Sequence, residues 1–424
     1  MLIQFSVKNW RSVRDEQTLS MVKAKGGELV ESNSFQPDAQ ATDALLHSAV
    51  IYGANAAGKS NLLNALRTMR VIVVNSATNK QEGDELPVVP FLLDEETIDS
   101  PTEFEAIFVA DNVRYQYGFS ATKTQVVDEW LIAFPNGRPQ RWFERAWDGE
   151  KYHWGLGGSL LGQKQLWQES TRSNALFLST ASLLNSKQLK PVFSWFKQTL
   201  GLGKVTGWTP NYTASLCEKD ESRTKVLEFL AAADLDIKDI LVTAEQLSTK
   251  HLPASIPEEI RKQLIDNVET PTKFYDIKTV HKGMQGQLVE FNFNEESDGT
   301  KKFFSFAGPW IDVLTRGRVL AIDELHDNLH PKLVKFLVEL FHNKKTNPYN
   351  AQLIFTTHET SILNQEVFRR DQIWFCEKTD NQATRLYPLS DFSPRKGRED
   401  LEAAYLSGRY GALPYVRPLK DTVS

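Results

Sequence analysis

The sequence predicts an α/β fold with a mainly parallel sheet, a flanking antiparallel sheet and a large, mainly helical insertion. Three observations support this prediction. A short apolar strand runs into a glycine-rich loop and then into a helical pattern near residue 53, short alternating strands follow between residues 104 and 134, and apolar strands alternate with helical patterns between residues 303 and 356. Strands that alternate with helices are typical of sheets whose strands run parallel.

The parallel sheet is predicted from three short apolar runs that each end in polar residues. Ala49–Tyr52 leads into the glycine-rich loop, after which the apolar spacing predicts a helix over Asn61–Val74. Val319–Ile322 and Gln352–Thr356 are two further strands, and the pattern between them predicts a helix over Pro331–Phe341. Helical spacing places apolar side chains three and four residues apart, whereas strands show either alternation or short apolar runs.

Antiparallel strands are expected near the N-terminus and around residue 115. Ile3, Phe5 and Val7 alternate with polar residues and predict an opening strand. Polar turns separate Phe104–Phe108, Tyr115–Phe119 and Val126–Phe134, a spacing typical of neighbouring antiparallel strands.

From about residue 160 to residue 263 the apolar spacing becomes mainly helical, and strand character returns near residues 273–280 and 287–294. We therefore expect a head formed by residues 1–120 and 286–424, interrupted by a strand-plus-helix insertion at residues 121–285.

Composition restricts the function. The chain has 424 residues, of which 41% are hydrophobic and 24% charged, as in a globular protein. No apolar run approaches the roughly 20 residues that cross a bilayer, and the N-terminus lacks the pattern of a signal peptide, so we expect a cytoplasmic protein without a membrane partner. Cys217 and Cys376 stand far apart without the spacing of metal ligands. The net charge of −5 gives no general attraction to nucleic acid, although a local basic patch would still bind it.

The glycine-rich loop Gly53–Ser60 matches the pattern G-x-x-x-x-G-K-[ST] in full, between a strand and a helix. Such a loop curls its backbone N–H groups around the phosphates of ATP, its lysine reaches the β- and γ-phosphate oxygens, and its serine hydroxyl binds Mg²⁺. The predicted cofactors are therefore ATP and Mg²⁺. The residues expected to bind the nucleotide from this loop are Gly53, Asn55, Ala57, Gly58, Lys59, Ser60 and Asn61.

Two carboxylates end the strand Val319–Ile322. Asp323 is expected to hold Mg²⁺ together with Ser60, and Glu324 to act as the general base that activates water. An apolar strand that ends in Asp-Glu is common by itself, and such a pair often has no function other than to end the strand at the solvent-exposed surface. Its pairing with the phosphate loop favours the catalytic interpretation.

A histidine and a helix start complete the candidate site. His358 follows the strand Gln352–Thr356 and takes the position of a histidine that senses the γ-phosphate. Ser297 and Gly299 lie in Glu-Ser-Asp-Gly-Thr just before a helix, a partial match to the ABC signature, which binds the γ-phosphate held by the opposite subunit. An acidic surface turn is the alternative interpretation of this segment.

Large aromatic side chains are frequent in the expected insertion. Aromatic residues form both partner-binding surfaces and protein cores, so both roles remain open. The residues concerned are Trp130, Trp142, Trp154, Trp167, Trp195 and Phe196. For the C-terminal run Gly408–Pro414, a packed turn is favoured over a nucleotide or nucleic-acid contact through Arg409 and Tyr410.

Taken together, these motifs resemble the stand-alone ABC-class ATPases known as AAA-type ATPases of bacterial antiphage defence, similar to the AriA subunit of PARIS systems and to abortive-infection ATPases. The opening run Val7–Ser12, the segment Asp323–Pro331 and the terminal Gly408–Pro414 add to the likeness, which covers roughly residues 1–120 and 285–424. The resemblance implies an ABC-class P-loop ATPase head. It also implies an ATP-dependent head-to-head dimer or higher homo-oligomer.

The same resemblance implies a sensor and regulator that responds to a phage-encoded trigger. Some relatives carry a Toprim nuclease domain after the ATPase, but the segment after His358 is too short for one and shows no such pair of acidic motifs. A separate toxic effector, expected to be a Toprim-type nuclease, would then supply the killing activity.

Two alternatives come from other classes. A compact DNA repair or recombination ATPase head would share the motifs but usually carries a long coiled coil, for which no heptad array is found. A transporter ATPase is disfavoured by the long segment between Lys59 and Ser297.

Overall fold

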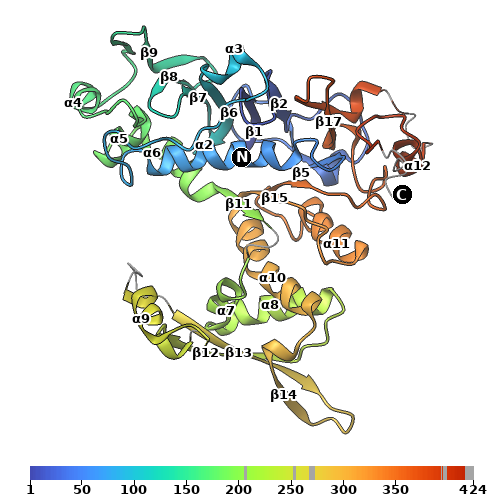
Figure 1. Ribbon diagram of the computed structural model, residues 1–424. Coiled ribbons are helices and arrows are strands. Elements are labelled where there is room, and N and C mark those ends of the chain that lie inside the picture. Colours follow the sequence, from blue (N-terminus) through green and yellow to red (C-terminus); the bar gives the residue numbers. More distant parts are fainter. Residues whose placement is uncertain (205–207, 252–254, 267–272, 393, 395–398, 416–424) are drawn as a thin grey trace, which may run out of the picture. The chain divides into compact units, whose positions relative to one another are not determined.

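The computed structural model describes residues 1–204, 208–251, 255–266, 273–392, 394 and 399–415 (Figure 1). The chain divides into two compact units. The first contains Met1–Val205, Leu314–Asp327 and Val334–Ser424, and the second contains Thr206–Val313 and Asn328–Leu333. None of the helices in the described ranges is long and apolar enough to cross a membrane.

A six-stranded sheet forms the centre of the first unit. Five neighbouring strands run parallel, and the sixth pairs antiparallel at one edge. In order across the sheet they are β11 (Leu200–Lys204), β15 (Val319–Asp323), β16 (Gln352–Thr356), β5 (Ser48–Gly53), β17 (Ile373–Lys378) and β18 (Thr384–Pro388). β5, β15 and β16 confirm the three predicted apolar strands, and β16 lies between the other two. Their carboxyl ends therefore meet at one edge of the sheet, which is where ligands of open α/β sheets bind.

A seven-stranded antiparallel sheet flanks this sheet in the same unit. The first of the three strands that sequence alternation predicts after residue 100 pairs with the opening strand, and the second and third follow it in order across the sheet. In order across the sheet the strands are β10 (Tyr152–Leu156), β9 (Gln140–Trp147), β8 (Val126–Phe134), β7 (Val113–Ala121), β6 (Thr102–Ala110), β1 (Leu2–Lys8) and β2 (Gln17–Ser20).

Helix α2 (Lys59–Asn75) contacts strands of both sheets, namely β5 and β15 on one side and β1 and β6 on the other (Figure 1). Its apolar side chains, among them Leu62, Leu66 and Met69, are buried in the largest hydrophobic core of the chain. The helix that follows the glycine-rich loop is thus fixed by packing along its length, and so is the loop at its start.

Short helices and a two-stranded sheet complete the first unit. The helix expected over Pro331–Phe341 is α11 (Pro331–His342). The remaining elements are α1 (Val30–Asn33), β3 (Ser34–Phe35), β4 (Leu45–Leu46), α3 (Glu95–Ile98), α4 (Lys164–Glu169), α5 (Phe177–Leu183), α6 (Lys190–Ser194), a π-helical turn (Trp195–Thr199), the 3₁₀ turns Arg370–Gln372 and Leu389–Phe392, and α12 (Leu401–Leu406).

The second unit combines helices with a three-stranded antiparallel sheet. Helix α7 packs on β12 and β13, and α8 packs on β12. The elements are α7 (Asn211–Cys217), α8 (Asp220–Ala232), β12 (Asp239–Gln246), the 3₁₀ turn Thr249–His251, α9 (Glu258–Asp266), β13 (Lys273–Lys282), β14 (Leu288–Asn292), the 3₁₀ turn Phe293–Glu295 and the first part of α10 (Asp298–Arg316).

These units differ from the insertion expected at residues 121–285. Residues 126–156 are three strands that extend the antiparallel sheet by backbone pairing from β7, and β11 joins the parallel sheet beside β15. Both segments therefore belong to the first unit, and the mainly helical character that we expected holds for residues 164–199 and for only part of the second unit.

The aromatic side chains of residues 121–199 mostly belong to the core. Trp142, Trp167, Trp195 and Phe196 are at most 5% exposed, and the Trp195 ring stacks on Phe108 with centroids 4.1 Å apart. Only the two other tryptophans of this set are half-buried. Core packing, one of the two roles left open by the sequence, thus accounts for most of these residues.

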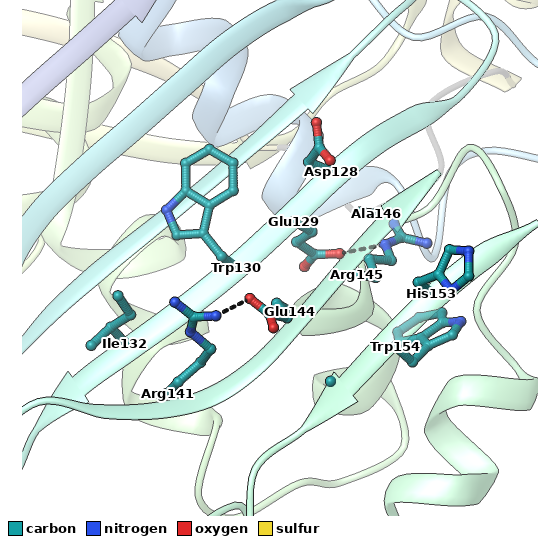
Figure 2. Close-up of a pocket in the computed structure, with 11 residues that line it drawn as sticks. Asp128, Glu129, Trp130, Ile132, Arg141, Glu144, Arg145, Ala146, His153 and Trp154 are labelled. Carbon is teal, nitrogen blue, oxygen red and sulfur yellow. Dashed lines mark hydrogen bonds and ion pairs between the residues drawn. The ribbon is translucent and has the colours of Figure 1, made fainter. Parts of the chain in front are cut away.

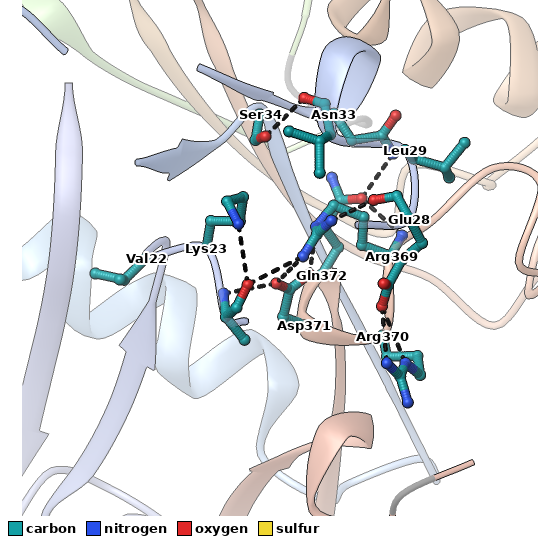
Figure 3. A network of polar contacts seen from close by, with 12 residues as sticks. Val22, Lys23, Glu28, Leu29, Asn33, Ser34, Arg369, Arg370, Asp371 and Gln372 are labelled. Atoms are coloured by element: carbon teal, nitrogen blue, oxygen red, sulfur yellow. Dashed lines mark hydrogen bonds and ion pairs between the residues drawn. The ribbon is translucent and has the colours of Figure 1, made fainter. Parts of the chain in front are cut away.

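A buried polar network, of which Figure 3 shows the part around Arg369 and Gln372, anchors the start of the strand that leads to the glycine-rich loop. The Gln372 amide donates to both the carbonyl (3.1 Å) and the hydroxyl (2.8 Å) of Ser48, the first residue of β5. The Gln372 carbonyl accepts from the Asn33 amide and from the backbone N–H of Arg369, whose guanidinium binds Asp371. A fully satisfied buried network favours one arrangement of the strand.

Candidate functional site

Two glycines allow the loop between β5 and α2 to pack closely against its neighbours. A methyl group on Gly53 would overlap the carbonyl oxygen of Cys376 on β17. A methyl group on Gly58 would overlap the Thr384 hydroxyl on β18, and the φ of Gly58 is +109°, a conformation that side chains other than glycine rarely adopt. The loop conformation therefore depends on glycine at both positions, as the phosphate-loop pattern predicts.

Side chains from both ends of the chain hold this loop. The Thr384 hydroxyl contacts the Ala57 carbonyl (3.0 Å) and the Ser12 hydroxyl (2.7 Å), and the Cys376 thiol donates to the same carbonyl (3.3 Å). Asn61, expected to contact nucleotide, donates its amide to the Ser12 hydroxyl (2.8 Å). These contacts fix the backbone of the loop without using its exposed side.

The expected nucleotide contacts differ in exposure. Asn55 and Ala56 at the tip are exposed, Ser60 is half-buried, and Ala57, Gly58 and Lys59 are buried. The Lys59 ammonium donates to the Gly53 (2.8 Å) and Ala54 (3.0 Å) carbonyls. Burial lowers the pKa of Lys59, and Asp323 and Glu324 are close enough to oppose that effect.

Thr356 joins the two expected catalytic carboxylates. Its buried hydroxyl donates to Oδ1 of Asp323 (2.7 Å) and accepts from the backbone N–H of Glu324 (2.8 Å). Glu324 has a φ of +57°, a strained conformation for a residue with a side chain, and its carboxylate is exposed. β16 thus orients both acidic residues at the end of β15.

His358, the residue expected to sense the γ-phosphate, lies against the phosphate-loop lysine. Its Nε2 is 3.2 Å from the Lys59 ammonium, and its ring meets that of His326 edge to face with centroids 5.4 Å apart. The pKa of His358 is lowered to about 4 by partial loss of hydration, by the Lys59 charge and by His326. His358 is therefore neutral near pH 7, and its Nε2 is able to accept a hydrogen bond from the ammonium.

Ser60 and Asp323 are the residues expected to offer oxygen ligands to Mg²⁺. No cluster of three or more histidine, cysteine or acidic side chains suited to a metal occurs within the described ranges. Magnesium bound with nucleotide needs only one or two protein oxygens, because phosphate oxygens and waters complete its octahedron. The Ser60 hydroxyl and the Asp323 carboxylate would meet this requirement, since Ser60 lies in the first turn of α2 and Asp323 ends β15.

Ser297 and Gly299 lie in the second unit at the start of α10. The Ser297 hydroxyl accepts from the backbone N–H of Thr300 (3.1 Å), so it caps its own helix. A methyl group on Gly299 would make only an ordinary contact with the Ser297 hydroxyl, at 3.8 Å, and both residues are accessible. Glu296 is held by Thr279 and by His281 (2.6 Å). An accessible helix start of this kind is able to bind an anion.

The C-terminal run is a packed turn, which confirms the favoured alternative. Tyr410 is fully buried, and its hydroxyl donates to Glu399 (2.6 Å), which also pairs with Arg409 (2.6 Å). The Tyr410 ring stacks on Phe375 of β17.

A cavity of about 480 Å³ lies on strands β8 to β10, away from any of the motifs (Figure 2). Its charged side chains are largely paired with one another, as in Arg141 with Glu144 and in the fully buried pair Glu129 and Arg145 (3.1 Å). Burial raises the pKa of Glu129, whose carboxylate also accepts the backbone N–H of Phe177 at the start of α5. This pair fixes α5 to the antiparallel sheet.

Sequence reasoning missed the roles of Thr356, Ser12 and Thr384. For His326 it favoured a subunit contact over a metal ligand and missed the contact with His358, and Thr356 stands beside predicted residues in the run Thr356-Thr357-His358. Ser12 and Thr384 lie 372 positions apart and meet only through folding.

Comparisons with known proteins show what the chain is similar to. A family model described as "AAA domain, putative AbiEii toxin, Type IV TA system" matches residues 48–364. No curated protein matches the chain. Among solved structures, the SMC head domain from Thermotoga maritima aligns with a TM-score of 0.39 and 11% identity over 91% of this chain and 98% of that one. The recombination mediator protein RecF with ATP aligns with a TM-score of 0.39 and 13% identity over 92% and 99%.

Proposed function

Because the chain belongs to this family of AAA domains, which matches residues 48–364, we propose that it is the ATP-driven regulator of a separate toxic effector in antiphage defence. The chain is an ATPase of the AAA and ABC type. The finer proposal, a sensor of a phage-encoded trigger that controls a nuclease, rests on the motif resemblance. The family's description as a putative toxin of a toxin–antitoxin system is consistent with a defence role and names neither a trigger nor a nuclease.

One observation carries the assignment of the site. The carboxyl ends of three adjacent strands bring Lys59, Asp323, Glu324 and His358 to one edge of the sheet, with Lys59 3.2 Å from His358. A cation for phosphate, a carboxylate for Mg²⁺, a second carboxylate for water and a neutral histidine are the groups that phosphoryl transfer to water requires.

Each of these residues has a distinct role in the proposed reaction. The backbone N–H groups of the loop and Lys59 bind the phosphates. Ser60 and Asp323 hold Mg²⁺, which neutralises phosphate charge when bound. Glu324 accepts a proton from the attacking water, because its carboxylate is exposed at the strand end. His358 contacts the γ-phosphate through the side of its ring nearest to Lys59.

A head-to-head dimer is part of the proposal. Ser297 and Gly299 of one subunit would bind the γ-phosphate on the loop of the other, because an accessible helix start offers N–H groups to an anion. Nucleotide binding would then join two subunits and hydrolysis would separate them.

Replacement of the loop lysine tests the site. Lys59→Ala should abolish ATP binding in calorimetry, because it removes the cation of the phosphate loop. Lys123→Ala is the matched control, since Lys123 is exposed in the turn between β7 and β8. An unchanged affinity for ATP in the Lys59 variant would overturn the assignment.

Expression with and without the neighbouring gene tests the regulatory role. Defence should require both proteins, and growth arrest on phage challenge should disappear in the Lys59 variant. Nucleic-acid cleavage by the purified single chain would contradict a separate effector. An ATPase rate that rises with DNA, together with sensitivity to DNA damage after gene deletion, would favour a repair or recombination head.

A further inference from the structure

We propose that residues 399–412 form a positioning element for His358, and that Thr360 and Glu402 are its positioning residues. This inference rests on the role proposed above for His358. It assigns a function to the C-terminal Gly408–Pro414 run, which the nucleotide chemistry leaves unexplained.

Two direct contacts join the segment after His358 to the C-terminal residues. The Thr360 hydroxyl donates to the Glu402 carboxylate at the start of α12, with an O···O distance of 2.6 Å. Five residues later, the Gln365 amide donates to the Glu399 carbonyl (3.1 Å). A hydroxyl that donates to a carboxylate forms a short, strong hydrogen bond, so it restricts the backbone on both sides of Thr360.

A third contact joins the same segment to the strand of the phosphate loop. The Tyr52 hydroxyl donates to the Glu359 carbonyl (3.0 Å), the residue after His358. Tyr52 immediately precedes Gly53, is completely buried, and packs its ring on Tyr405 of α12 with centroids 5.8 Å apart. α12 therefore touches the strand that leads into the loop of Lys59 and the segment that follows His358.

The C-terminal element is itself fixed to the sheet. The Tyr387 hydroxyl on β18 donates to both Glu377 of β17 (2.9 Å) and the Tyr410 carbonyl (2.8 Å). Glu377 accepts the backbone N–H of Ala412 (3.2 Å), and the Tyr405 hydroxyl donates to the Ala412 carbonyl (3.2 Å). The glycine at position 411 has a φ of +68°, and a side chain there would come within 2.8 Å of Glu377 and Tyr387.

Precise placement of His358 has a kinetic consequence. Its Nε2 lies 3.2 Å from the ammonium of the lysine proposed to bind phosphate. A small shift of the segment therefore moves the imidazole and also changes its contact with Lys59. Displacements of about 1 Å from the productive geometry cost up to roughly 10²-fold in rate. Loss of the Thr360–Glu402 contact alone should lower the rate by less than this, because the contacts of Tyr52 and Gln365 still hold the segment.

Substitutions at the two positioning residues test the inference. In the full chain, Thr360→Val and Glu402→Gln should each lower kcat by about threefold to tenfold, while the Kd for ATP and the melting temperature stay close to those of the wild type. Thr360→Ser keeps the hydroxyl and should keep kcat. Glu366→Gln is the matched control, because Glu366 is an exposed carboxylate of the same segment.

A second background separates this inference from the proposed function. Because Glu402 acts through the histidine, Glu402→Gln should cause no further loss of kcat in a His358→Ala chain. The same loss in both backgrounds, or a fall in melting temperature with kcat unchanged, would overturn the positioning role. Full activity of the single His358→Ala chain would instead refute the proposed role of the histidine. A loss of activity in the His358→Ala chain, together with unchanged activity of the Thr360 and Glu402 variants, would refute only the positioning role.

Discussion

Thr356→Val is the substitution that best tests how the acidic residues are oriented. Valine matches the shape of threonine but has no hydroxyl, and position 356 is completely buried in the middle of the parallel sheet. The change removes two hydrogen bonds at once, one to the Asp323 carboxylate and one from the backbone N–H of Glu324. Nothing that touches nucleotide in the proposed site is altered directly.

The expected magnitude follows from those two bonds. A hydrogen bond to a charged group contributes about 1.5–3 kcal/mol and a bond between neutral groups about 1 kcal/mol, so the free energy of unfolding should fall by about 2.5–4 kcal/mol. Glu324 loses the contact that holds its strained φ of +57°, so its carboxylate should no longer be held toward the attacking water. Misplacement of both carboxylates should lower kcat by roughly 10²-fold.

The assay is steady-state ATP hydrolysis at saturating Mg²⁺, together with urea denaturation and ATP calorimetry. Thr356→Ser is the control, because it keeps the hydroxyl and loses one methyl group, which costs about 1 kcal/mol. The serine variant should retain kcat although it is less stable. Equal loss of kcat in both variants, or wild-type kcat in the valine variant, would refute the reasoning that the hydroxyl orients Asp323 and Glu324.

Three further predictions concern the base, the dimer and a buried histidine. Glu324→Gln should keep ATP binding and lose hydrolysis by roughly 10²–10⁴-fold in a phosphate-release assay; wild-type turnover would place the base elsewhere. A Ser297→Ala chain mixed with a Lys59→Ala chain should regain part of its ATPase rate, because one complete composite site forms, whereas monomers in ATP and no regain would count against the dimer. His342, whose pKa burial lowers from 6.5 to about 3, takes up a proton more readily when unfolded, so stability should fall as pH drops from about 6.5 toward 3. Urea midpoints at several pH values should show a weaker fall in His342→Gln, and parallel curves would exclude this histidine as the cause.

The fold could be predicted from the sequence wherever the local residue pattern agrees with the strand pairing in the tertiary structure. The strand before the phosphate loop and the strand before Asp323 are short apolar runs, and both are central strands of the parallel sheet. β11 was missed because Leu200-Gly201-Leu202-Gly203 follows a helical spacing and resembles a glycine-rich turn. It is a strand because glycine allows close pairing with β15, where a side chain on Gly201 would come within 3.3 Å of the Val319 carbonyl. Pairing with a distant strand leaves no local signal.

The same distinction applies to the site. Gly53, Lys59 and Asp323 were predicted because the chemistry of phosphate binding needs these residue types at fixed spacing. Ser12 and Thr384 support the loop but belong to no phosphate-binding motif, since any small hydroxyl side chain that folding brings to these positions would serve. Residues that act on the ligand are constrained by chemistry, whereas residues that support the loop are constrained only by geometry.

The contacts of Lys59 show that nucleotide binding is an exchange of partners. Its ammonium already donates to the Gly53 and Ala54 carbonyls and lies 3.2 Å from the neutral ring of His358. A phosphate oxygen must replace at least one of these partners, so the lysine contributes the difference between the bonds to phosphate and the bonds within the loop. That difference is favourable because a charged acceptor replaces neutral ones. An anion beside Lys59 also offsets the positive charge that lowers the pKa of His358. Phosphate binding at the loop and protonation of His358 are therefore coupled through the Lys59 side chain.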